Sequence, residues 1–127
     1  MMVGVVLVSH SRALVEALRD YTKVIAPQAA VAVAGGMSDG SFGTSYVSVF
    51  RAIDEVNGPD GAIVLVDMGA AAMVVKMVLA DMNDEGVRMV DCPFVEGAVE
   101  ATVQAQAGIE RDAIVESLKS LSKLRKF

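Results

Sequence analysis

Short apolar runs alternate along the chain with segments in which apolar residues recur every three or four positions. The short runs have the length and the branched side chains of buried strands. They cover residues 3–8, 30–34, 62–66 and 87–90. The helical spacing predicts helices after Ser11, after Thr44 or Ser45, and over about residues 70–83, 95–106 and 111–124. This alternation predicts an α/β fold of three layers, in which helices cover both faces of a mostly parallel sheet.

The length of the chain predicts a single domain over residues 1–127, because one core of this size is common and a second would not fit. The core is expected to be aliphatic, since Trp is absent and Phe and Tyr are few. Most of the eight methionines fall at helical spacing and are expected to fill this core, whereas Met37 and Met68 are the ones expected on a partner-facing surface. No apolar run approaches the roughly 18 residues of a membrane span, and none resembles a secretory signal. We therefore expect a cytoplasmic protein that does not enter membranes.

Charge and cysteine content narrow the possible functions. The net charge of −5 argues against nucleic-acid binding, because the Lys and Arg residues are scattered and form no basic face. Their one cluster is interpreted as the cations of a final helix turn and comprises Lys119, Lys123, Arg125 and Lys126. The single cysteine, Cys92, has apolar neighbours, which predicts a buried and inert thiol.

The residues that could do chemistry stand at predicted strand ends. His10, the only histidine, follows the first strand, and Asp67 follows the third. Ligand crevices of open parallel sheets lie at this edge, and neighbouring strands are about 4.8 Å apart. A carboxylate that accepts from one imidazole nitrogen leaves the other nitrogen as a nucleophile. The sequence predicts such a catalytic pair, with a surface histidine and a capping or Mg2+-binding aspartate as the alternatives.

A glycine-rich loop, residues 35–43, follows the second strand. Glycine amides and helix starts can present N–H groups to a phosphoryl group. A flexible turn at Asp39-Gly40 is the alternative interpretation. The loop is neither a Walker motif nor a dinucleotide fingerprint. The residues predicted to support a phosphoryl group are Ser9, Ser11, Gly36, Gly43, Thr44, Ser45 and Gly69, and no metal ligand is predicted.

Five spaced motifs resemble the phosphotransferase subunits of phosphoenolpyruvate-dependent dihydroxyacetone kinases, a family related to mannose-type IIA domains. These motifs are residues 6–11, Gly35-Gly36, Asp39-Gly40 with Gly43-Thr44-Ser45, residues 66–69 with Met73, and residues 93–98. The resemblance implies the strand order 2-1-3-4 and a homodimer. The chain departs from the family at residues 70–74, where Ala-Ala-Ala-Met-Val replaces the usual Ser-Ala-Arg-Met-Asn. That helix start therefore lacks polar groups that the family has.

The resemblance also implies a function. His10 would receive a phosphoryl group from the carrier protein HPr and pass it to ADP on the nucleotide-binding kinase subunit, with Asp67 orienting the ring. No cofactor is expected on this chain itself, since Mg2+ and ADP would come with the acceptor. Two alternatives stay open: a mannose-type IIA domain of a sugar permease, and a regulatory binding module without turnover. Asp67-Met68-Gly69 differs from the Asp-Leu-Phe-Gly-Gly-Ser-Pro segment typical of the permease domains.

Overall fold

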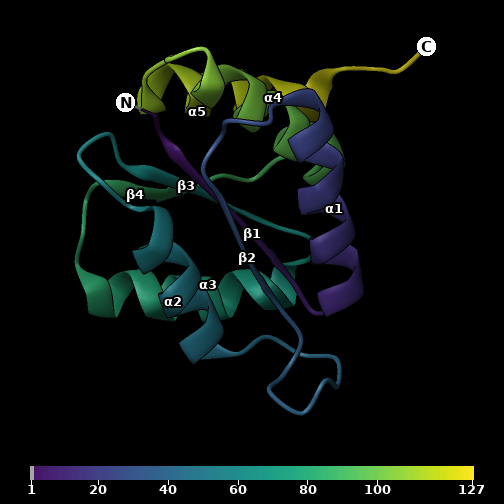
Figure 1. Cartoon of the computed structure of the whole chain (residues 1–127), viewed down its shortest axis with the longest axis vertical. Coiled ribbons are helices and arrows are strands. Elements are labelled where there is room, and N and C mark those ends of the chain that lie inside the picture. The colour runs from purple at the N-terminus through teal and green to yellow at the C-terminus, as the bar shows by residue number, and fades with distance from the viewer. Residues whose placement is uncertain (1) are drawn as a thin grey trace.

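A four-stranded parallel sheet forms the centre of the computed structural model, which describes residues 2–127 (Figure 1). The strands are β1 (Gly4–Ser9), β2 (Val31–Gly35), β3 (Ala62–Val66) and β4 (Val87–Met89). They lie in the order β2-β1-β3-β4, so the expected order is confirmed. Each strand begins and ends within one residue of its predicted bounds.

Five helices and a short 3₁₀ turn cover the sheet. They are α1 (Arg12–Ile25), α2 (Tyr46–Val56), α3 (Gly69–Met82), α4 (Phe94–Gln106), α5 (Arg111–Ser120) and η1 (Leu121–Lys123). Helices α1, α4 and α5 lie on one face and α2 and α3 on the other (Figure 1). The three-layer α/β/α prediction is therefore confirmed.

The last helix is shorter than predicted. Helix α5 ends at Ser120, and the chain continues through a 3₁₀ turn into an extended tail. Lys123 lies in that turn, and Arg125 and Lys126 lie beyond it. The interpretation of the basic cluster as the final turns of one helix is thus wrong, because only Lys119 belongs to the last turn of α5.

Serine side chains fix the starts of two helices at the edge of the sheet where β1 and β2 end. The Ser11 hydroxyl accepts a hydrogen bond from the Leu14 amide (3.2 Å) at the start of α1. The Ser45 hydroxyl accepts from the Ser48 amide (3.3 Å) at the start of α2. Such caps satisfy amides that have no partner inside the helix. Of the two start residues predicted for the second helix, Ser45 is the cap.

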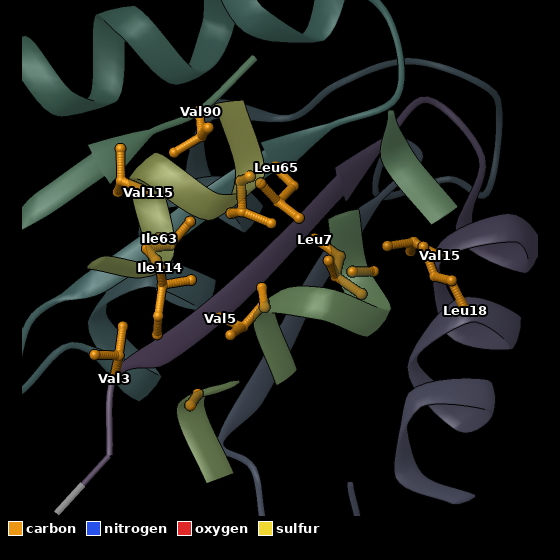
Figure 2. Close-up of a cluster of buried hydrophobic side chains, with 14 residues drawn as sticks. Val3, Val5, Leu7, Val15, Leu18, Ile63, Leu65, Val90, Ile114 and Val115 are labelled. Carbon is orange, nitrogen blue, oxygen red and sulfur yellow. The ribbon is translucent and has the colours of Figure 1, made fainter. Parts of the chain in front are cut away.

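The core consists of two apolar layers, one on each face of the sheet. Val5 and Leu7 point into the layer beneath α1, α4 and α5, and Val6 and Val8 point into the layer beneath α2 and α3. Figure 2 shows the first layer, where strand residues meet Val15 of α1 and side chains of α5. Because both faces of β1 are covered, its sequence is a continuous apolar run without alternation.

Helix α3 is apolar on both of its faces. Its inner face is buried through Ala71, Val75 and Val78. On the outer face, Met73 and Met77 are 69% and 59% exposed. The expectation that methionines at helical spacing fill the core is wrong for these two residues, because spacing marks a face of a helix without showing which face meets the sheet. Among residues 2–127, no helix has the length and the apolar character that crossing a bilayer requires.

We predict that Leu7→Ala lowers the free energy of unfolding by about 2–5 kcal/mol, because the side chain is fully buried in the central strand and its removal leaves a cavity. Leu14→Ala is the matched control, since Leu14 on α1 is 43% exposed. It should cost under about 1 kcal/mol. Urea unfolding of both variants measures the difference. Equal losses for the two variants would contradict the assignment of β1 to the core.

Candidate active site

His10 lies directly beyond β1, where that strand turns into α1, and its side chain is partly exposed. Strand β1 is paired on one side with β2, where Ser9 is in register with Gly35. On its other side it is paired with β3, where Val8 is in register with Val66. The three strand ends therefore bring the glycine-rich loop and Asp67 to the edge of the sheet at which His10 lies. This is the edge predicted from the sequence.

The last residue of the glycine-rich loop and the residue after it hold the backbone and the ring of His10. The Gly43 amide donates to the His10 carbonyl oxygen (3.0 Å). The Thr44 hydroxyl lies 3.2 Å from Nδ1 of the His10 ring, within hydrogen-bond distance. Thr44 is itself paired with Gly36 in a parallel bridge. Among residues 2–127 no hydrogen bond involves Nε2, so Nε2 is the ring nitrogen left open for chemistry.

Asp67 contacts the turn around His10 and not the ring itself. Its Oδ2 accepts a hydrogen bond of 2.7 Å from the Ser9 hydroxyl, and Ser9 Oγ in turn accepts from the Ser11 amide (2.9 Å). The sequence predicted that Asp67 accepts directly from an imidazole nitrogen, and the structure differs. Thr44 occupies Nδ1, and no hydrogen bond or ion pair joins His10 to Asp67 within the described part of the chain. Ser9 is fully buried, so this carboxylate and hydroxyl form a fixed support beneath His10.

Two glycines give the loop the backbone shape that this docking requires. Gly36 has φ +73° and Gly43 has φ +150°, a region that side chains disfavour. A Cβ at Gly43 would also stand 2.8 Å from the Met37 sulfur. Both glycines were predicted to approach a phosphoryl group. In the structure they shape the loop, and the Gly43 amide is already occupied by His10.

Arg12 is a site residue that the sequence reasoning missed. Its guanidinium donates to the Gly35 carbonyl (Nε, 3.4 Å) and to the Met37 carbonyl (Nη2, 3.1 Å). It thereby ties the first residue of α1 to the start of the glycine-rich loop. No local pattern signals this role, because the bonds span 23 and 25 positions of sequence.

The helix start nearest to Asp67 differs from the starts of α1 and α2 at this edge. Helix α3 begins at Gly69, and its cap residue, Met68, makes no side-chain capping bond. The first amides of α3 therefore have no side-chain acceptor, whereas Ser11 and Ser45 serve α1 and α2. Of the predicted phosphoryl-supporting residues, Gly69 alone opens a helix without a side-chain cap, which favours an anion nearby.

A cavity of about 360 Å³ lies beside Asp67. It is lined by the end of β3, by the segment from Met68 to Lys76 that includes the first half of α3, and by the end of β4 with the residues after it, among them Asp91 and Cys92. Asp67 Oδ1 is buried and has no hydrogen-bond partner among residues 2–127. In the same residues, no three His, Cys, Asp or Glu side chains are placed to hold a metal ion.

Cys92, which lines this cavity, is half-buried. The sequence predicts a buried thiol, so the structure differs from the prediction in the degree of burial. Burial raises the pKa of the Cys92 thiol to about 11, and the neighbouring charge of Asp91 acts in the same direction. The thiol is therefore neutral near pH 8, in line with the predicted inert character.

Comparison with known proteins defines the class. Residues 4–115 match the EIIA-man family, described as the PTS system fructose IIA component. The mannose/sorbose-specific IIA subunit from Enterococcus faecalis shares the fold, with a TM-score of 0.65 and 20% identity over 100% of this chain and 96% of its own. A second crystal structure, of the protein EF1359 of unknown function, has a TM-score of 0.85 at 22% identity, covering 100% of this chain and 99% of its own. The family match over residues 4–115, together with the shared fold, thus defines a mannose-type IIA domain of the phosphotransferase system.

Sequence relatives narrow the class to one family. The phosphotransferase subunit DhaM of the PTS-dependent dihydroxyacetone kinase from Lactococcus lactis is 32% identical, over 93% of this chain and 94% of its own. The phosphoryl donor subunit DhaM of dihydroxyacetone kinase 1 from Listeria innocua is 33% identical over the same shares. The Escherichia coli DhaM is 33% identical, but the match covers only 26% of that longer protein. The chain belongs to the DhaM family of dihydroxyacetone kinase phosphotransferase subunits, which confirms the resemblance seen in its motifs.

We predict that iodoacetamide modifies Cys92 at pH 8 more than about tenfold slower than it modifies free cysteine, whose pKa is ~8.5. The cause is the raised pKa of about 11, which leaves few thiolates. Mass spectrometry of timed samples measures the rate. The same chain in urea is the control, and its thiol should react at the rate of free cysteine. Equal rates in the folded and the unfolded chain would contradict the burial of the thiol.

Proposed function

We propose that this chain is the phosphoryl donor subunit of a phosphoenolpyruvate-dependent dihydroxyacetone kinase and that His10 carries the phosphoryl group. The observation that best supports this proposal is the way in which the His10 ring is bound. Nδ1 lies within hydrogen-bond distance of Thr44, and Nε2 has no hydrogen-bond partner in the described residues. Membership of the DhaM family supports the class of reaction. A ring held at one nitrogen and open at the other is suited to accept and release a group.

The proposed transfer needs no proton movement in this site. Nε2 of His10 attacks the phosphorus, the N–P bond forms, and the bond between phosphorus and the donor breaks in line with it. The proton on Nδ1 stays in place, so the phosphorylated ring is an imidazolium. In the second half of the cycle an oxygen of the ADP β-phosphate attacks, and the N–P bond to Nε2 breaks. The ring then returns to its neutral state with the same proton.

Asp67 is proposed to stabilise the charged ring through its own charge and through the turn that it supports. Its Oδ2 holds Ser9, the residue before His10, and Ser9 holds the amide of Ser11, the residue after it. A fixed negative charge near a developing positive charge lowers the barrier most where solvent is excluded. The burial of Ser9 and of Asp67 Oδ1 supports this role.

The proposed partners are the carrier HPr as donor and the nucleotide-binding kinase subunit, with its Mg2+ and ADP, as acceptor. Exposed apolar side chains at this edge support protein partners, since Phe42 is 80% and Met68 67% exposed. Phe42 precedes Gly43 and Met68 follows Asp67, so they belong to the two segments that carry the contacts around His10. Phe and Met are among the residues enriched at protein–protein interfaces. A cytoplasmic homodimer completes the proposal and rests on the family resemblance alone.

We predict that phosphoenolpyruvate, enzyme I and HPr together add one acid-labile phosphoryl group per chain, and that His10→Ala abolishes the labelling. His10 is the only histidine, so labelling that persists in the variant contradicts the site. The reaction without HPr is the control. Addition of kinase subunits, ADP and dihydroxyacetone should discharge the label, whereas a sugar-permease IIB subunit should not. Discharge by the IIB subunit alone would favour the permease function, and an absence of labelling would favour a regulatory module.

We predict that Asp67→Asn slows phosphorylation of His10 by roughly tenfold to hundredfold, the equivalent of about 1.4–2.8 kcal/mol in the barrier. The amide retains an acceptor for Ser9 but loses the charge. Asp91→Asn is the matched control, because Asp91 lines the same cavity and makes no hydrogen bond to the Ser9 turn. Rapid-quench labelling with limiting phospho-HPr gives the rates. Equal rates for the Asp67 variant and the wild type would show that the carboxylate is only structural.

A further inference from the structure

We infer that Thr44 is a positioning residue that sets the tautomer of His10. Its Oγ1 accepts the hydrogen of Nδ1, so that the lone pair of the neutral ring stays on Nε2. The two atoms are 3.2 Å apart, and no other hydrogen bond to the His10 ring occurs among residues 2–127. The tautomer of a histidine is set by the hydrogen bond that one of its nitrogens makes. In this site that bond comes from Thr44 and not from Asp67.

The direction of the bond follows from the chemistry of the ring. If Thr44 donated to Nδ1, the ring hydrogen would move to Nε2, and neither nitrogen would offer a lone pair. With Nδ1–H as the donor, the lone pair stays on Nε2, which is then the nucleophile. The direction of the bond rests on the proposed function, because that function requires a nucleophilic Nε2. Thr44 is partly exposed, so its own hydroxyl hydrogen can reach solvent. The same bond becomes charge-assisted when phosphorylation makes the ring an imidazolium.

Contacts of the neighbouring residues fix the backbone of Thr44 on both sides. On one side, the Gly43 amide is bound to the His10 carbonyl, which joins the two segments directly. On the other side, Ser45 caps α2 and so fixes the first turn of that helix. Arg12 anchors the beginning of the loop through the Gly35 and Met37 carbonyls. A supporting hydroxyl held on fixed backbone is the arrangement that keeps a reactive group in its productive geometry.

The test is the tautomer of His10, read from the ¹⁵N chemical shifts of the ring in the uniformly labelled, unphosphorylated protein. We compare the wild type with Thr44→Val, which keeps the shape of the side chain without its hydroxyl, and with Thr44→Ser, which keeps the hydroxyl. Ser38→Ala is the matched control, because Ser38 lies in the same loop and makes no hydrogen bond to His10. Amide spectra check that each variant is folded.

We expect the wild type to populate mainly the Nδ1–H form. The Val variant should shift the tautomer ratio toward Nε2–H by roughly fivefold or more, the effect of one ordinary hydrogen bond. The Ser variant should restore the ratio, and the Ala control should leave it unchanged. Phosphorylation by phospho-HPr should slow in the Val variant and recover in the Ser variant.

Two results would overturn the role of Thr44: a wild-type ring that is mainly Nε2–H, or a Val variant with the wild-type ratio. Because the spectra need no phosphoryl donor, they separate this inference from the proposed function. A wild-type protein that shows the expected tautomers but takes up no phosphoryl group would sink the proposed function and leave the positioning by Thr44 intact.

Discussion

The parallel pairing of β1 between β2 and β3 is the constraint on which the rest of the structure depends. It buries both faces of β1 and so forces helices onto both sides of the sheet. It also aligns the carboxyl ends of three strands, with Ser9 beside Gly35 and Val8 beside Val66. The contacts that Thr44, Gly43 and Arg12 make across the site span the pairing of β1 with β2, and the Ser9–Asp67 bond spans the pairing of β1 with β3. A shift of one residue in either register would turn the side chains to the opposite face and separate His10 from its supports.

The site divides its support of His10 between two neighbouring strands. The loop after β2 reaches the ring and the carbonyl of His10 through Thr44 and Gly43. The end of β3 reaches the turn through Asp67 and Ser9. The loop after β2 therefore contacts the ring, and the end of β3 supplies a half-buried carboxylate to the turn that carries His10. This division leaves Nε2 of the ring without a hydrogen-bond partner among residues 2–127, as the proposed phosphoryl transfer between two proteins requires.

Local patterns were sufficient for much of this picture. Short stretches of sequence predict the strands, the Ser11 cap and the positions of His10 and Asp67 at strand ends. They suffice because hydrophobic spacing and capping chemistry act over a few residues. Spacing alone misplaced Met73 and Met77, which face outward from α3. It also extended α5 beyond Ser120, since neither Pro nor Gly marks the end of that helix.

The sequence by itself determined the alternating architecture, and it indicated the edge of the sheet and the histidine for which chemistry is proposed. Only the tertiary structure decided which groups touch that histidine. Thr44 lies 34 positions from His10, Asp67 lies 58 positions from Ser9, and Arg12 reaches a loop 25 positions away. Such contacts depend on loop geometry and on the register of packed strands, which no local pattern encodes. The physical reason is that side-chain reach is a few ångströms, so partners are chosen only after the strands have paired.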